Sequence, residues 1–121
     1  ALRRAAAACA ATGNGMSATP QLVSVIAPCR NERAQVLAFC DAVAAQQLPE
    51  GVQLEVLVAD GESDDGTRAL LEARCATDER FVCVDNPGRI VSTGLNRCLK
   101  RSRGAVIVRM DLHTDYAEDY I

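Results

Sequence analysis

Four short apolar runs, separated by longer amphipathic segments, organise the chain. The apolar runs are residues 22–27, 54–59, 81–85 and 105–109. Their hydrophobicity is mostly continuous rather than alternating, which is typical of strands buried on both faces of a parallel sheet. The segments between them, residues 33–47, 66–77 and 92–102, repeat apolar residues at helical spacing. This order predicts an α/β fold, in which a parallel sheet carries helices on both faces and right-handed crossovers join the strands.

Local signals predict where the helices begin, end and face the core. The expected N-terminal caps are Asn31 for the first helix, Ser63 or Asp64 for the second, and Ser92 or Thr93 for the third. Gly104 suits a left-handed cap after the third helix. The helical spacing places Leu37 and Leu99 on the inward stripes of the first and third helices.

Length and composition define one domain. The 121 residues suffice for a single compact domain, and an apolar fraction of 49% allows a real core. We expect residues 1–20 to be a disordered or non-native extension, since the Ala-rich start is too short and weakly apolar for a secretory signal. Residues 21–121 then form the domain. The formal net charge of −3 does not favour non-specific nucleic-acid binding.

Two further features have simple structural explanations. Four cations, Arg97, Lys100, Arg101 and Arg103, are expected on the exposed face and C-terminal turn of the third helix. The six cysteines form no C-x-x-C motif, and five lie in apolar segments, which indicates buried reduced thiols in a cytoplasmic protein. No apolar run approaches the ~20 residues needed to span a membrane.

Polar residues follow three of the four predicted strands. They are Arg30, Asn31 and Glu32 after the first, Asp60 after the second, and Asp111 and His113 after the fourth. In open parallel sheets, ligands bind beyond the carboxyl ends of the strands. We therefore expect these side chains to share one crevice at that edge of the sheet.

The pair Asp111 and His113 is a candidate metal site. Two residues apart in an extended segment, both side chains point to the same side. A carboxylate and an imidazole there can hold a divalent cation against phosphate oxygens. A solvated loop after a strand is the alternative. Asp60 likewise either accepts hydrogen bonds from a base or ribose or caps a turn.

Other nucleotide-binding motifs are absent from the sequence. The first predicted strand leads into PCRNE at residues 28–32, where a P-loop or a dinucleotide fold would carry a glycine-rich loop. A sugar nucleotidyltransferase would also need such a loop with Lys or Arg. The acids Glu62, Asp64 and Asp65 are interpreted as turn and cap residues rather than ligands.

Several ordered motifs resemble family 2 glycosyltransferases. The segments are VSVIAPCRNE at residues 23–32, VADGESDDGT at 58–67 and MDLH at 110–113, the last in the place of the family's D-x-D motif. The arrangement around MDLH is most similar to succinoglycan-type exopolysaccharide transferases. The resemblance implies the Rossmann-like, nucleotide-sugar-binding half of a GT-A fold, truncated at its C-terminus. It also implies hexosyl transfer from a nucleotide-diphospho-sugar, UDP preferred, to a saccharide or lipid-linked acceptor in polysaccharide biosynthesis.

The resemblance implies a role for each matching residue. Pro28, Arg30 and Glu32 would lie along the base and ribose, and Asp60 would bond the uracil ring. Asp111 would contact the ribose or a divalent cation, Mn²⁺ or Mg²⁺. His113 replaces the usual second Asp on that cation, and its softer imidazole favours Mn²⁺.

The resemblance also implies what lies outside this sequence. The general base is expected beyond residue 121, so we expect this chain alone to bind UDP weakly and to transfer no sugar. Membrane association, at the inner face of the plasma membrane, would come through further C-terminal segments. A non-catalytic nucleotide-binding α/β domain and a sugar nucleotidyltransferase remain the alternative functions.

Overall fold

The predicted sequence of strands and helices is confirmed in a computed structural model, which describes residues 21–112. The elements are β1 (Gln21–Cys29), α2 (Arg33–Ala44), β2 (Val52–Asp60), α3 (Thr67–Thr77), β3 (Phe81–Asp85), α4 (Val91–Arg101) and β4 (Val106–Arg109). The expected N-terminal extension, residues 1–20, lies outside the described residues, as does His113.

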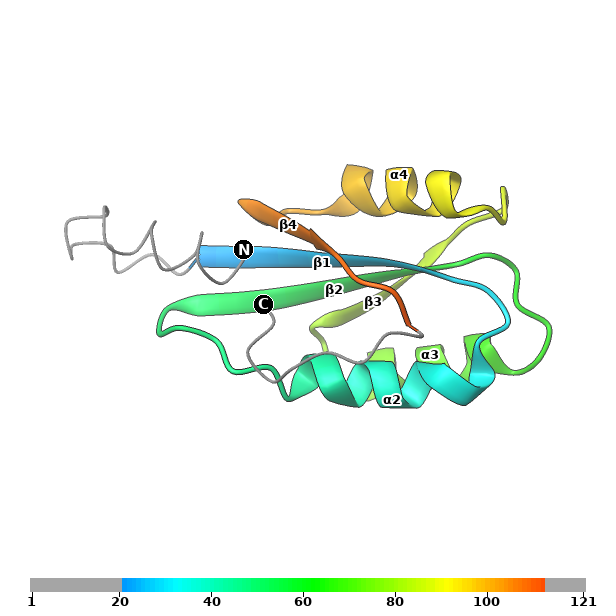
Figure 1. Cartoon of the computed structure of the whole chain (residues 1–121), viewed down its shortest axis with the longest axis horizontal. Coiled ribbons are helices and arrows are strands. Elements are labelled where there is room, and N and C mark those ends of the chain that lie inside the picture. The colour runs from blue at the N-terminus through cyan, green and yellow to red at the C-terminus, as the bar shows by residue number, and fades with distance from the viewer. Residues whose placement is uncertain (1–20, 113–121) are drawn as a thin grey trace.

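The four strands form one parallel sheet in the order β3-β2-β1-β4. The chain therefore steps outward from β1 to β3 and then returns past β1 to place β4 on the opposite side. The helices α2 and α3 cover one face of the sheet, and α4 covers the other (Figure 1). The strand order reverses between β1 and β4, and in doubly wound sheets this switch point is where ligands bind.

Strand alternation divides the core into two layers. On the α2 and α3 face, Val25 and Ala27 of β1 pack with Val56 and Val58 of β2. The intervening residues point to the α4 face, where Cys98 packs in a smaller cluster whose other fully buried members are Ile26, Leu57, Ala59 and Val84. Continuous hydrophobicity in β1 and β2 thus reflects burial on both faces, as predicted.

The predicted helix caps are wrong. Glu32, Gly66 and Ile90 occupy the N-cap positions, and none of the three helices has a side-chain cap hydrogen bond. Several of the expected capping side chains bond elsewhere: the Ser63 hydroxyl donates to Asp60, and the Thr93 hydroxyl donates to Asn86. Asn31, for example, accepts a hydrogen bond from the Asp64 amide at 2.9 Å rather than from its own helix.

Gly104 and two leucines also differ from expectation. Gly104 does not have positive φ, and the C-cap of α4 is instead Ser102, which has an extended backbone. A Cβ at Gly104 would stand 2.5 Å from the Ser24 hydroxyl oxygen, so close packing explains this glycine. Leu37 and Leu99 are exposed, at 46% and 45%, because each lies to one side of the stripe that its helix buries.

For the described residues the cysteine prediction is confirmed in part, because Cys29, Cys40 and Cys98 are buried but Cys75 and Cys83 are only partly buried. Cys29, Cys40, Cys75, Cys83 and Cys98 are all free thiols. Burial raises the pKa of Cys40 and of Cys98 to about 11, so both stay protonated near neutral pH. Among residues 21–112, no helix has the length and hydrophobicity required to cross a bilayer.

Candidate functional site

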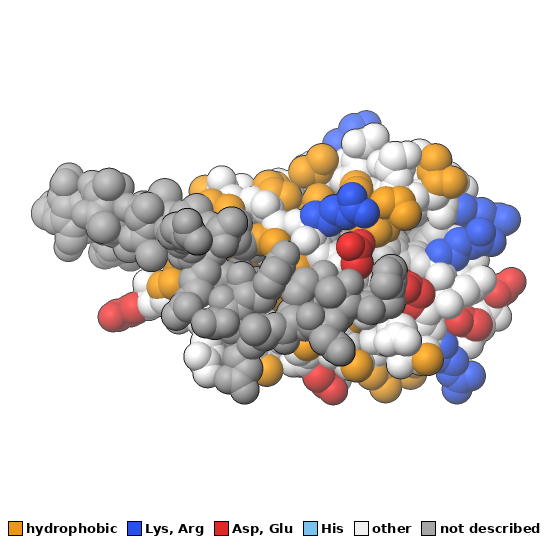
Figure 2. Space-filling view, in the orientation of Figure 1, with side chains coloured by type: hydrophobic (Ala, Val, Ile, Leu, Met, Phe, Trp, Pro, Cys, Tyr) orange, Lys and Arg blue, Asp and Glu red, His pale blue; other side chains and the backbone are white. Residues whose placement is uncertain are grey.

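Loops from all four strands meet at the carboxyl edge of the sheet. Three backbone hydrogen bonds extend the strand pairing into these loops: Gly61 to the Cys29 carbonyl (2.8 Å), Asn86 to Asp60 (3.0 Å) and Met110 to Ile26 (3.0 Å). Acidic and basic side chains gather at this end of the molecule, on the right in Figure 2. The edge is therefore both polar and held in register by the sheet.

A cleft of about 210 Å³ opens at the switch point between β1 and β4. Its walls are the ends of these two strands, the β1–α2 loop and the β3–α4 loop. The lining residues are Pro28, Cys29, Arg30, Glu32, Asn86, Arg89, Ile90, Val91, Asp111 and Leu112. The cleft combines two arginines, two carboxylates and an apolar lip formed by Ile90 and Val91.

Four of the predicted site residues line this cleft together: Pro28, Arg30, Glu32 and Asp111. They come from chain segments about eighty residues apart, and the parallel pairing of β1 with β4 brings them together. His113, the second predicted metal ligand, lies outside the described residues.

Asp60 ends β2, one strand away, and does not line the cleft. Its side chain is 1% exposed and is used within the protein. The Ser63 hydroxyl donates to Asp60 Oδ1 at 2.6 Å, and Arg68 lies 3.5 Å from Oδ2. The geometry therefore gives Asp60 the turn-stabilising role that was the alternative for this residue, and its bond to a base stays a prediction.

The loops after β1 and β2 are joined by side chains. Besides binding Asp60, the Ser63 hydroxyl accepts a hydrogen bond from the Asn31 amide at 2.8 Å. Asp65 accepts from the backbone amides of Thr67 (3.0 Å) and Arg33 (3.3 Å), which confirms its role as a turn residue, although Gly66 rather than Asp65 is the N-cap of α3. Hydrogen bonds from Thr67 lower the pKa of Asp65, so it remains ionised.

Among residues 21–112, three non-glycine residues have left-handed backbones, and all three lie at this edge. They are Asn31, Glu62 and Arg89, with φ of 50°, 59° and 66°. Such conformations are unfavourable for most residues and concentrate at functional sites. Gly61 lies among these loops, where a Cβ would come within 3.0 Å of the Arg89 carbonyl oxygen and 3.4 Å of Arg30 Cβ. Close loop packing thus sets the shape of the edge.

The charges of the cleft suit an anionic ligand with an associated cation. Arg109 lies 3.6 Å from the carboxylate of Asp111, whose side chain is 37% exposed. Burial, with the nearby charges of Glu32 and Asp60, raises the pKa of Cys29, so this lining residue is a neutral thiol rather than a nucleophile. Within residues 21–112, no three His, Cys, Asp or Glu side chains group as metal ligands.

The contribution of the β3–α4 loop to the cleft was not predicted from the sequence. Asn86 is 3% exposed and donates from Nδ2 to the Ile90 carbonyl at 2.9 Å, while Thr93 donates to its Oδ1 at 2.8 Å. This shapes the turn that brings Arg89 to the cleft. The same rule that selected residues after the other strands would have pointed to the residues that follow β3.

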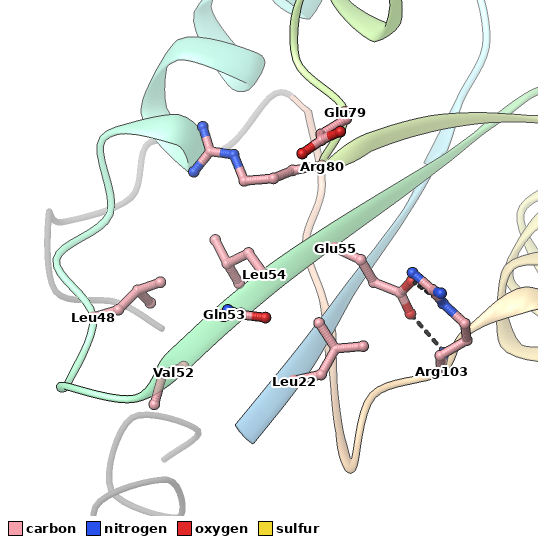
Figure 3. A pocket seen from close by; sticks show the side chains of 9 residues that line it. All are labelled: Leu22, Leu48, Val52, Gln53, Leu54, Glu55, Glu79, Arg80 and Arg103. Carbon is pink, nitrogen blue, oxygen red and sulfur yellow. Dashed lines mark hydrogen bonds and ion pairs between the residues drawn. The ribbon is translucent and has the colours of Figure 1, made fainter. Parts of the chain in front are cut away.

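A second hollow, of about 580 Å³, lies at the opposite, amino end of the strands (Figure 3). Three of its charged side chains, Glu55, Arg80 and Arg103, are already paired. Arg103 donates from its amide to Glu55 at 2.6 Å, and hydrogen bonds from Arg80 lower the pKa of Asp78 to about 2. We therefore assign the candidate site to the smaller cleft, where the strand topology and the predicted residues coincide.

Comparison with solved structures identifies the fold. A mannosyltransferase of Pyrobaculum calidifontis, in complex with GDP-Man and Mn²⁺, matches 93% of this chain and 39% of its own, with a TM-score of 0.68 and 24% identity. TarS of S. aureus, in complex with UDP-GlcNAc, matches 75% of this chain and 26% of its own, with a TM-score of 0.59 and 22% identity. The parallel sheet with helices on both faces is therefore part of a GT-A fold, as expected.

Curated relatives agree with this fold. The succinoglycan biosynthesis protein ExoA of Rhizobium meliloti is 32% identical over 98 residues, which are 79% of this chain and 29% of that protein. The glycosyltransferase AglE of Haloferax volcanii is 30% identical over 97 residues, 79% of this chain and 32% of that protein. The chain thus spans about a third of these relatives. Residues 24–121 match the family described as glycosyl transferase family 2, to which this chain belongs.

Proposed function

We propose that this chain is the donor-binding part of a glycosyltransferase. It would bind a nucleotide-diphospho-sugar, UDP preferred, for hexosyl transfer to a saccharide or lipid-linked acceptor in polysaccharide biosynthesis. The observation that carries the proposal is the cleft between the ends of β1 and β4, which combines arginines with Asp111. Membership of family 2 and the similarity to a succinoglycan biosynthesis protein support it.

The cleft residues would each contact one part of the donor. Pro28, Arg30 and Glu32 lie on the β1 side, where they would follow the base and ribose. Asp60 would reach the base only after giving up its bond to Ser63, since it is buried. In this arrangement the protein contributes orientation and exclusion of water more than it contributes reactive groups.

The described residues fit a divalent cation, Mn²⁺ or Mg²⁺, that the phosphates of the donor would also bind. Such cations often use one or two carboxylates and complete their shell with phosphate oxygens and water. Asp111 would supply the carboxylate, and His113 would be the second protein ligand. The bound ion would neutralise charge that develops on the departing diphosphate. Arg109, 3.6 Å from Asp111, would orient that carboxylate.

Calorimetry on the folded chain tests the proposal. We expect UDP or GDP to bind in the presence of Mn²⁺ and to bind more weakly without it. Asp111→Ala should lower this affinity at least about tenfold, because it removes a charged contact. Asp64→Ala is the matched control, since this acid lies at the same edge but does not line the cleft. Metal-independent binding, or none, would favour a non-catalytic α/β domain.

A further inference from the structure

Arg89 is a basic residue of the cleft that the proposed donor contacts do not use. It follows β3, lines the cleft and has a half-exposed side chain. The contacts around Gly61 bring the Arg89 backbone next to Arg30, so arginines from two loops flank the same opening. Within residues 21–112, Arg30 forms no ion pair with an acid.

The partner of Arg89 is Glu62, on the neighbouring β2–α3 loop. Arg89 Nε lies 2.5 Å from Glu62 Oε1, with side chains 55% and 50% exposed. Ion pairs this exposed contribute little to stability, because water competes for both charges. The backbone around Arg89 is better fixed, since its amide donates to the Asn86 carbonyl at 3.0 Å. The loop position is therefore firm, while the guanidinium contact is easily exchanged.

We propose that Arg89 binds the anionic diphosphate of the donor and releases Glu62 when it does so, an inference that rests on the proposed function. A guanidinium can form two parallel, charge-assisted hydrogen bonds with phosphate oxygens. A diphosphate carries more charge than a single carboxylate and would be held inside the cleft. Glu62 thus competes with the ligand for Arg89 and lowers the affinity of the site.

This exchange is tested by measuring how tightly the full chain binds UDP, GDP and inorganic pyrophosphate in the presence of Mn²⁺. Arg89→Asn removes the charge with a residue that tolerates the left-handed backbone, and should weaken binding about tenfold. Glu62→Gln frees Arg89 and should tighten binding about two- to fivefold. In the double variant the gain from Glu62→Gln should disappear. Arg97→Ala, an exposed arginine on α4 away from the cleft, is the control.

The outcomes separate this proposal from the function on which it rests. The exchange would be overturned if Glu62→Gln still increased ligand affinity in the Arg89→Asn background. Unchanged affinity in either single variant would also overturn it. Binding that is lost in Asp111→Ala but unaffected by Arg89→Asn would overturn the role of Arg89 and leave the proposed function standing. A folded chain that binds none of the three ligands, with or without Mn²⁺, would overturn both.

Discussion

The two ends of the sheet carry similar charged side chains and hold them differently. At the amino end, Glu55 is 5% exposed and accepts hydrogen bonds from the Ser24 hydroxyl (2.5 Å) and the Arg103 amide (2.6 Å). At the carboxyl end, Arg89 and Glu62 form one exposed ion pair across two loops. A buried and fully bonded charge stabilises the fold, whereas an exposed pair can be exchanged for a ligand.

The hollow in Figure 3 shows this difference most clearly. It is larger than the cleft at the switch point, yet its buried carboxylate, Glu55, is already bonded to Arg103. The cleft instead lies where loops with left-handed residues meet. Size is therefore a poorer guide to the site than the partners of the lining side chains.

The largest effect is expected at Gly104. In Gly104→Ala, the new Cβ would come within 2.5 Å of Ser24 Oγ and 2.8 Å of the Leu22 carbonyl oxygen. Because β1 cannot move without disturbing the sheet, we expect a loss of about 3 kcal/mol in unfolding free energy, measured with urea. Gly51→Ala is the control, because this residue has open space but φ of 82°, and should lose only about 1 kcal/mol. Equal losses would refute the packing explanation.

Removal of the buried carboxylate should have the next largest effect. Glu55→Ala leaves the Ser24 hydroxyl and the Arg103 amide without their acceptor, which should cost about 2 kcal/mol. Thermal and urea unfolding measure the loss. Glu79→Ala, an exposed acid that lines the same hollow, should change stability by less than about 0.5 kcal/mol. Similar losses in both variants would mean that the hydrogen bonds of Glu55 add no more to stability than an exposed acid does.

The contribution of Glu55 should depend on pH. Burial opposes its ionisation, but hydrogen bonds from Ser24 and Arg103 outweigh burial and lower the pKa of Glu55 below its usual value. A lowered folded-state pKa gives stability that is present above the unfolded value of about 4.3 and lost as pH falls through the folded value. The stability difference between the wild type and Glu55→Gln should therefore be greatest near pH 7 and narrow towards pH 3. A difference that widens in acid would contradict this assignment.

The smallest change in stability is expected at the carboxyl end. Glu62→Gln breaks only an exposed pair, so the free energy of unfolding should change by less than about 0.5 kcal/mol. The same variant should change ligand affinity, as proposed above, so one substitution separates binding from stability. A loss as large as that of Glu55→Ala would show that both ends of the sheet serve the fold alike.

Prediction from sequence succeeded where the signal was local. The apolar runs located all four strands, and the polar residues after them included Arg30, Glu32 and Asp111 of the cleft. Residues whose role depends on distant partners were misread. Asn31 appeared to be a helix cap, but its backbone is left-handed, and it bonds the loop after β2 through Ser63 and Asp64.

The sequence alone determined the order of strands and helices, the two buried faces of β1 and β2, and membership of the family, because periodic hydrophobicity and short motifs are properties of neighbouring residues. Only the tertiary structure decided that β4 pairs with β1 and that Arg89 faces Glu62. These features depend on contacts between residues about 30 to 80 positions apart, and such contacts form only when the crossovers bring distant loops to one edge of the sheet.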